Sequence, residues 1–275
     1  MPIHPTAIVD PHAELDGSVT VGPYCIIEGH VQVGANCRLF QNVYLTGWTR
    51  IGADCELHPG VIVGHAPQDT KYKGERSYCR IGRGTILREY VTIHRGTVPE
   101  SATVVGEDCF LLAGSHVGHN CALGNRVTLI NIVLLAGHVT IHEGTTLGGG
   151  AAVHQFVRIG ELAMVTGNAR VRMDVLPFAL VDVDGRIAGL NRVGLRRAGI
   201  SRDDASSIRD AYRIALARGL SIEQRIEGLQ SEPASPPVAR IIEFLKAESK
   251  RGIAGPARRN PHSPDEVGLP DMDRE

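Results

Sequence analysis

The amino-acid sequence predicts a mainly β protein, in which a parallel β-helix is followed by a small α-helical C-terminal domain. Three observations lead to this expectation. Aliphatic residues recur at every sixth position from Ile3 to Val171, and small or β-branched residues lie two positions before them. Glycine is abundant, with 32 residues, whereas aromatic residues make up 4% of the chain, which favours tight corners over a sandwich core. After about residue 175 the spacing of apolar residues becomes that of amphipathic helices.

The six-residue period predicts the shape of the first part of the chain. Only Asp69, Glu75 and Pro99 break the aliphatic column, and glycine often follows it, as at Gly22 and Gly34. Hexapeptide repeats of this kind build parallel β-helices, in which three hexads form one triangular coil. About nine such coils, stacked at ~4.8 Å, make a prism about 45 Å tall. We therefore expect the β-helix to occupy residues 1–175.

The second part of the chain carries helix signals. Ser201 is suited to cap a helix that ends at Gly219, and residues 221–229 and 236–248 indicate two more, the last with Pro236 and Pro237 in its first turn. These helices place the helical domain at residues 176–250. Residues 251–275 are polar and contain prolines, so we expect a disordered tail there.

Composition excludes several classes of function. The formal net charge of −1 gives no general basic field for nucleic acid, and no apolar run approaches the ~20 residues of a membrane span. The first residues lack the charged and apolar regions of a signal peptide, so we expect a cytoplasmic protein without stable membrane insertion.

All six cysteines fall in the column of small residues. They are Cys25, Cys37, Cys55, Cys79, Cys109 and Cys121. Five lie in regular coils and are expected to point inward as small apolar side chains, and Cys79 lies at the edge of a loop. No CxxC spacing occurs, which argues against a metal site or disulfides.

Chemistry on a prism must come from turn residues and from the loops that interrupt the coils. The two candidate loops are residues 64–80 and 94–104, which are rich in charged and hydrogen-bonding groups. Residues 18 apart stack in successive coils, so His119 is paired with Gly137 and Asn120 with His138. The same arithmetic gathers His116, His119, His138 and His154 on one edge, but places His94 one face away. A neighbouring subunit of a trimer would have to bring His94 to the edge.

Three roles for this histidine cluster stay open. Histidines from two subunits would suit zinc, although no carboxylate is a clear partner. A single imidazole is a good general base near neutral pH. The cluster would also serve as a protein-binding surface on a scaffold.

The general base is favoured because an oxyanion donor accompanies it. Gly137, stacked beside His119, is placed to offer its N–H to a developing oxyanion. No nucleophile is evident, since Ser115 and Cys121 both belong to the inward-facing column. This combination indicates direct acyl transfer without an acyl-enzyme.

Six segments of the chain resemble a known family. These are APQDTKYKGE (66–75), VTIHRGT (91–97), HVGHNC (116–121), LAGHVTI (135–141), AAVHQF (151–156) and LNRVGLRRAG (190–199). Together they resemble the bacterial UDP-N-acetylglucosamine O-acyltransferases that begin lipid A synthesis, over residues 3 to about 250. The resemblance implies a left-handed β-helix and a homotrimer. It also implies transfer of an (R)-3-hydroxyacyl group from acyl carrier protein to the sugar 3-hydroxyl of UDP-N-acetylglucosamine, without metal or bound cofactor.

The resemblance also assigns residues. His119 matches the general base and Gly137 the oxyanion donor, and Gly167 matches a position that limits acyl length, where glycine leaves room for a longer chain. Asn191 and Arg197 match residues that lie towards the nucleotide. The positions that match the lining of the sugar and acyl sites are Gln68, Asp69, Lys71, His94, His116, His138, His154 and Gln155.

The chain departs from the family at three places. Asn120 replaces the usual aspartate after the base, so it can fix the histidine tautomer but cannot stabilise the imidazolium by charge. Asn131 is the lone polar residue among Ile130, Ile132, Val133 and Leu134, and Ala198 shortens a basic run. His–Asn resembles the sibling glucosamine N-acyltransferases, so N-acyl transfer to an amino-sugar nucleotide is the first alternative. Those enzymes usually carry an extra N-terminal domain. A non-catalytic binding prism is the second alternative.

Overall fold

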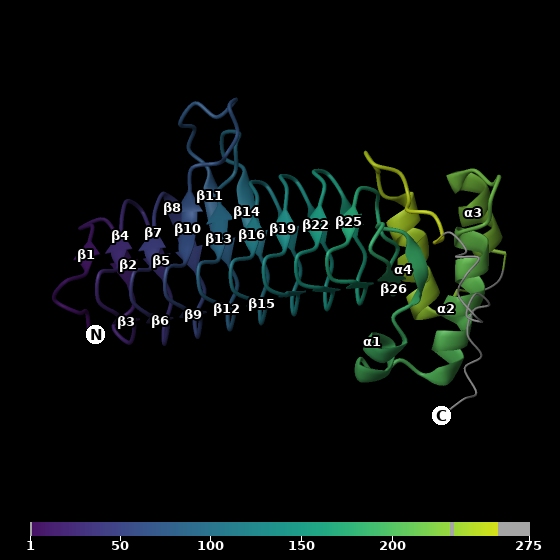
Figure 1. Ribbon diagram of the computed structural model, residues 1–275, viewed down its shortest axis with the longest axis horizontal. Coiled ribbons are helices and arrows are strands. Elements are labelled where there is room, and N and C mark those ends of the chain that lie inside the picture. Colours follow the sequence, from purple (N-terminus) through teal and green to yellow (C-terminus); the bar gives the residue numbers. More distant parts are fainter. Residues whose placement is uncertain (1, 232–233, 258–275) are drawn as a thin grey trace.

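The computed structural model describes residues 2–231 and 234–257 and shows a triangular prism of three sheets with a helical cap at one end (Figure 1). The first sheet contains β1 (Ile8–Val9), β4 (Ile26–Ile27), β7 (Tyr44–Leu45), β10 (Ile62–His65), β13 (Thr92–His94), β16 (His116–Val117), β19 (Leu134–Leu135), β22 (Ala152–Val153) and β25 (Arg170–Val171). The second contains β2 (Glu14–Leu15), β5 (Gln32–Val33), β8 (Trp48–Ile51), β11 (Tyr78–Ile81), β14 (Ala102–Val105), β17 (Ala122–Leu123), β20 (Thr140–Ile141) and β23 (Arg158–Ile159).

The third sheet closes the triangle. It contains β3 (Thr20–Val21), β6 (Arg38–Leu39), β9 (Glu56–Leu57), β12 (Ile86–Leu87), β15 (Phe110–Leu111), β18 (Thr128–Leu129), β21 (Thr146–Leu147), β24 (Met164–Val165), β26 (Ala179–Val181) and β27 (Ile187–Leu190). Pairing is parallel throughout the three sheets except between β26 and β27. These two strands lie beyond residue 175, where we expected the helical domain to begin.

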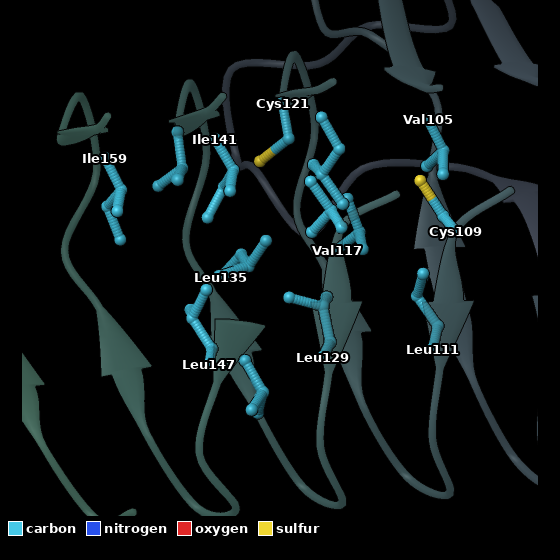
Figure 2. Packing of buried hydrophobic residues seen from close by; sticks show 14 of the residues in the cluster. Val105, Cys109, Leu111, Val117, Cys121, Leu129, Leu135, Ile141, Leu147 and Ile159 are labelled. Carbon is cyan, nitrogen blue, oxygen red and sulfur yellow. The ribbon is translucent and has the colours of Figure 1, made fainter. Parts of the chain in front are cut away.

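The core of the prism is formed by the aliphatic and small residues that the six-residue repeat predicts to point inward. Aliphatic side chains point into the prism from every coil, and Figure 2 shows Leu111, Leu129 and Leu147 stacked in one row. All six cysteines are buried free thiols. Cys79 belongs to β11 and is also fully buried, because the loop before it ends at residue 77 rather than residue 80.

The corners depend on two kinds of residue. Among the described residues, fifteen non-glycine residues adopt positive φ, including Asn36 (φ 60) and Asn120 (φ 59), and nearly all are third residues of a corner turn. Most glycines that follow the aliphatic column, such as Gly22 and Gly82, have ordinary φ values instead. Their role is steric, because a Cβ on Gly82 would lie 2.4 Å from the backbone carbon of Gly106 in the next coil. The repeated glycines therefore let successive coils approach closely.

The helical cap contains α1 (Arg192–Arg197), α2 (Arg202–Ala215), α3 (Ile222–Leu229) and α4 (Pro236–Lys246). Ser201 caps α2 by accepting from the N–H of Asp204, and Ser221 with Gln224 forms a capping box on α3. Helix α2 ends at Ala215, four residues before the predicted Gly219. In the described part of the chain, no helix has the length and apolarity needed to cross a bilayer.

A buried ion pair fastens the cap to the last coils. Arg158 contacts the fully buried Asp174 at 2.7 Å, lies over the ring of Phe244 from α4 and donates to the Phe244 carbonyl at 3.2 Å. Residues after α4 return to the prism, since Ile253 forms a β-bridge with Asp174. The start of the expected tail, residues 251–257, is thus paired with the last coils, and the remainder lies outside the described residues.

Candidate active site

One corner of the prism gathers the predicted site. The turns at residues 118–120, 136–138 and 154–156 connect strands of the first sheet to strands of the second, and we call this corner the histidine edge. Both loops leave the prism at the same corner, at residues 66–77 and 95–101 (Figure 1). They are shorter than expected because β10, β11, β13 and β14 extend into the charged segments. The loops and the histidine turns therefore flank one another.

His119 lies against Gly137 of the next coil, as the stacking arithmetic predicts. A Cβ on Gly137 would lie 2.4 Å from Nε2 of His119, so a larger residue would push the ring out of this position. The His119 side chain is 16% exposed and its ring meets that of His138 edge-on, with centroids 5.1 Å apart. The N–H of Gly137 has no hydrogen-bond partner among the described residues. A donor and an imidazole thus face the same space.

Asn120 fixes the orientation of this imidazole. Its Oδ1 accepts hydrogen bonds from the backbone N–H of Thr97 (3.0 Å) and from the Thr97 hydroxyl (2.9 Å), and lies 3.0 Å from Nδ1 of His119. A backbone N–H can only donate, so the atom that faces His119 is the amide oxygen. His119 must then carry its proton on Nδ1, which leaves the Nε2 lone pair free to accept a proton.

Residues of the first loop complete the surroundings of His119. Oδ2 of Asp69 lies 3.9 Å from Nε2 of His119, and Asp69 Oδ1 accepts from the N–H of Lys71 at 2.9 Å. The loop is held by Arg95, which donates to the Tyr72 hydroxyl at 2.8 Å and to the Gly64 carbonyl at 2.8 Å. The side chains of Gln68 and Lys71 are exposed on the outside of the loop.

The structure corrects the position of His94. Its ring meets that of His116 edge-on at 4.9 Å, and it is buried beside the cluster in the same chain, not one face away. The error came from assuming a constant coil length. Ile62 pairs with Thr92 and Thr92 with His116, so the coils that carry the loops are longer than 18 residues. His94 therefore reaches the cluster without a neighbouring subunit.

Burial lowers the pKa of the histidines around His119. Burial is the largest cause for His94, whose pKa falls to about 4 with further contributions from the charges of His116 and His65. The pKa of His116 is lowered by burial and by the charge of His119, and the pKa of His138 by the same two effects and by Lys250. These rings are therefore neutral near pH 7 and act as hydrogen-bonding groups.

His154 extends the edge towards the helical cap. Its Nε2 is 3.0 Å from Nη2 of Arg251, and Arg251 Nε donates to the Gln155 carbonyl at 2.8 Å. The ring of Phe156 stacks on that of His138, with centroids 4.7 Å apart, and the Lys250 ammonium lies 4.7 Å from the Phe156 ring centroid. The segment after α4 thus supplies two cations to the edge.

Three of the expected site residues lie elsewhere in the chain. Asn191 caps α1 by accepting from the N–H of Gly194 and also donates to the Leu162 carbonyl at 2.8 Å. Arg197 is exposed at the end of α1, in the helical cap. Gly167 lies at the corner between the third and first sheets, where a Cβ would meet the Gly149 carbonyl at 3.2 Å. One chain does not bring these residues to His119.

Sequence reasoning missed Thr97, Lys250 and Arg251. The signal for Thr97 was available, because it lies in the second loop at one of the segments that carry the resemblance. Lys250 and Arg251 had no signal, since they lie where the helical domain was expected to give way to the disordered tail. Only the return of the chain along the last coils brings them to His154 and Phe156.

The described residues offer neither a nucleophile nor a metal cluster at this edge. Ser115 and Cys121 are buried in the core, and burial raises the pKa of the Cys121 thiol to about 12. Within the described ranges, no group of three or more His, Cys, Asp or Glu side chains is arranged to hold a metal ion.

Comparison with known proteins places the chain in a family. The profile described as UDP N-acetylglucosamine O-acyltransferase, domain 2, matches residues 174–254. The acyl-[acyl-carrier-protein]–UDP-N-acetylglucosamine O-acyltransferase of Thermodesulfovibrio yellowstonii is 41% identical over 254 residues, which cover 91% of this chain and 98% of that protein. The chain belongs to the UDP-N-acetylglucosamine O-acyltransferase family. It is therefore an O-acyltransferase.

Other family members support this membership over nearly the whole chain. The relative from Gloeothece citriformis is 41% identical over 257 residues and covers 93% of both chains. The structure of LpxA from Acinetobacter baumannii superposes with a TM-score of 0.89 at 36% identity, covering 92% of this chain and all of that one. As in this family, the prism is a left-handed parallel β-helix with a small helical C-terminal region.

Proposed function

We propose that this O-acyltransferase moves an (R)-3-hydroxyacyl group from acyl carrier protein to the 3-hydroxyl of UDP-N-acetylglucosamine, the first step of lipid A synthesis. The named substrates of its relatives support this choice. The observation that carries it is the close approach of the His119 ring to Gly137, where a Cβ would lie 2.4 Å from Nε2. We also propose that the enzyme works in the cytoplasm.

The reaction proceeds in one enzyme-assisted displacement. Nε2 of His119 takes the proton of the sugar hydroxyl as its oxygen attacks the thioester carbonyl. The Gly137 N–H donates to the oxyanion of the tetrahedral intermediate, where an oriented donor is most effective. The carbon–sulfur bond then breaks, and the imidazolium returns its proton to the departing thiolate of the carrier. His119 ends neutral, and no covalent enzyme intermediate forms.

The remaining predicted residues bind the substrates in this proposal. Asp69 and His138, both beside His119, orient the sugar hydroxyls, and the neutral rings of His94 and His116 hydrogen-bond to the substrate from the same cluster. Gln68, Lys71, His154 and Gln155 contact the acyl and sugar groups from the rim. Asn191 and Arg197 would come from a neighbouring subunit to the nucleotide, and Gly167 leaves space for a long acyl chain.

A homotrimer accounts for these separated residues and for an unusual apolar surface. Tyr24, Tyr90 and Ile132 are 61–70% exposed at the corner between the third and first sheets, and Ile8 and Leu134 are exposed on the adjoining first sheet. Ile132 also adopts φ 60, which is an outlier for a β-branched residue. An exposed and strained isoleucine is explained if the corner packs against another copy of the chain.

N-acyl transfer is the second candidate, and Asn120 is the observation that favours it. An amine is a better nucleophile than a hydroxyl, so its acylation needs less help from a charged partner behind the base. The acceptor oxygen of Asn120 orients His119 but carries no charge to stabilise the imidazolium.

A single-turnover assay separates these functions. Purified protein would be mixed with a series of 3-hydroxyacyl carrier proteins and either UDP-N-acetylglucosamine or its 3-amino analogue, and product would be followed by mass. We expect O-acylation by the wild type and a loss of roughly 10²–10⁴-fold in rate for His119→Ala. His4→Ala, which changes an exposed histidine far from the edge, is the control. Wild-type turnover by His119→Ala would refute the base assignment, and transfer to the amine alone would select the second candidate.

A further inference from the structure

A pocket lies on the outer face of the second sheet, at the end of the prism opposite to the helical cap. Its volume is about 610 Å³, within the range of small-molecule sites. It is lined by His12, Glu14, His30, Gln32, Trp48, Thr49, Arg50, Arg76, Tyr78 and Arg80. None of these residues belongs to the histidine edge or to the proposed reaction.

One wall of the pocket is a ladder of rings. The rings of His30 and Trp48 stack at 5.7 Å, and those of His12 and His30 meet edge-on at 5.5 Å. Trp48 and Tyr78 are register partners on β8 and β11. Because every member comes from a strand or turn of consecutive coils, the ring faces are held in place by the sheet itself.

The other wall carries uncompensated positive charge. Arg50 and Arg80 are direct register partners on neighbouring strands, and neither forms an ion pair among the described residues. Like charges opposite one another in a sheet are destabilising. Glu14 lies on β2, two strands away from Arg50 on β8. Its carboxylate accepts a hydrogen bond from Gln32, on the strand between them, at 2.9 Å. The arginine pair therefore has no carboxylate opposite it.

A third guanidinium covers the junction of the two walls. Arg76, from the end of the first loop, lies 5.5 Å from the ring centroid of Trp48 and 5.6 Å from that of Tyr78, and Arg80 lies 5.5 Å from the Tyr78 centroid. The carboxylate of Glu100 is 3.8 Å from Arg76 and accepts from the Tyr78 hydroxyl. A guanidinium that stacks on a ring keeps its in-plane N–H groups available for an anion.

We propose that this pocket binds a phosphorylated small molecule with a planar ring, of the size of a nucleoside diphosphate. The paired guanidiniums of Arg50 and Arg80 hold the phosphate oxygens, which are well matched by bidentate arginine donors. The planar ring of the ligand packs along His30 and Trp48, and the hydroxyl groups of the ligand reach Gln32 and Glu14. The bound anion relieves the repulsion between the two arginines.

The sole tryptophan of the chain is Trp48, so its fluorescence reports on this pocket alone. The full-length protein would be titrated with ADP, with pyrophosphate and with adenosine. We expect a saturable change with ADP, a weaker one with pyrophosphate, and the weakest binding with adenosine. The double variant Arg50→Ala/Arg80→Ala should raise the dissociation constant of ADP at least about tenfold, since it removes charge-assisted hydrogen bonds.

Two variants make the result specific. Arg38→Ala/Arg126→Ala removes the same charge from exposed arginines outside the pocket and should change the dissociation constant by less than about twofold. Arg50→Lys keeps the charge but loses the planar fork, and should weaken ADP binding to an intermediate extent. The proposal is overturned if ADP produces no saturable change up to the millimolar range, if adenosine binds as tightly as ADP, or if the two double variants behave alike.

Discussion

Asn120 holds its position at φ 59 and gathers three donors on one oxygen, two from Thr97 and one from His119. Thr97 thereby ties the second loop to the orientation of the proposed base. The arrangement replaces electrostatic support with geometric support, because an amide oxygen accepts the Nδ1 proton but carries no net charge.

The variant Asn120→Asp should alter the pH dependence of the reaction. A carboxylate beside Nδ1 favours the imidazolium, so we expect the acidic limb of the kcat/KM profile to move to higher pH by about one unit, with little change in stability. The measurement is the pH–rate profile of both proteins. Asn42→Asp, at an exposed turn residue that also has positive φ, is the control. An unchanged limb in Asn120→Asp would show that position 120 is not coupled to the base.

His94 makes stability sensitive to mild acid. Burial and neighbouring histidines lower its pKa to about 4, whereas the unfolded chain has a histidine pKa near 6.5. The unfolded state therefore binds more protons between these values, and stability present above about pH 6.5 is lost as the pH falls through 4. We expect His94→Gln to unfold at a temperature that falls less between pH 7.5 and pH 5 than the wild type does. An equal fall would contradict this assignment.

At the scale of the element, the corner turns show why the chain contains so many glycines. The abundance of glycine predicted tight corners, and glycines such as Gly84 and Gly114 do adopt positive φ there, as asparagines do. It did not predict that glycines after the aliphatic column, such as Gly82, serve close packing of coils. The six-residue column depends on inward and outward alternation, which a strand imposes on its own sequence. The stacking of coils decides which atoms of the next coil lie close to a corner. The sequence pattern within one coil therefore does not predict these contacts.

Gly82→Ala should therefore destabilise the prism. Its Cβ would lie 2.4 Å from backbone carbon and 2.6 Å from backbone nitrogen of the next coil, so the coils must separate. We expect a loss of ~1–3 kcal/mol in the free energy of unfolding, as for other overpacked sites. Gly17→Ala, which meets nothing within 4 Å, should be neutral or slightly stabilising. Chemical denaturation of the two variants compares them directly, and equal effects would remove the steric explanation.

At the scale of the whole molecule, Ile132 tests the proposed assembly. Ile132→Asn places a residue that tolerates positive φ at this corner, so it relieves strain in a single chain while it removes an apolar contact between chains. We expect trimers of the variant to dissociate at a higher protein concentration than wild-type trimers do, as measured by sedimentation equilibrium. Ile86→Asn, on the third sheet, is the control for loss of an outward apolar side chain. A variant trimer as stable as the wild type would exclude this corner from the interface.

The β-helix, the inward cysteines and the neighbourhood of His119 could all be predicted because they follow from a repeated local rule. The positions of His94, Lys250 and Arg251 could not be predicted in this way. The position of His94 depends on the lengths of the loops, and those of Lys250 and Arg251 depend on the return of the chain from α4 to the last coils. The arithmetic succeeded for Gly137 and His138 because no loop separates them from His119.

The two loops together explain why a single histidine was misplaced. From Ile62 to Thr92 the coil gains two hexads, and from Thr92 to His116 it gains one, which together amount to one complete coil. Counting by coils therefore assigns the correct face both before the first loop and after the second, and fails only for the strands between them. A relative that carried one loop without the other would, by counting alone, be assigned a histidine edge on the wrong face of an otherwise identical prism.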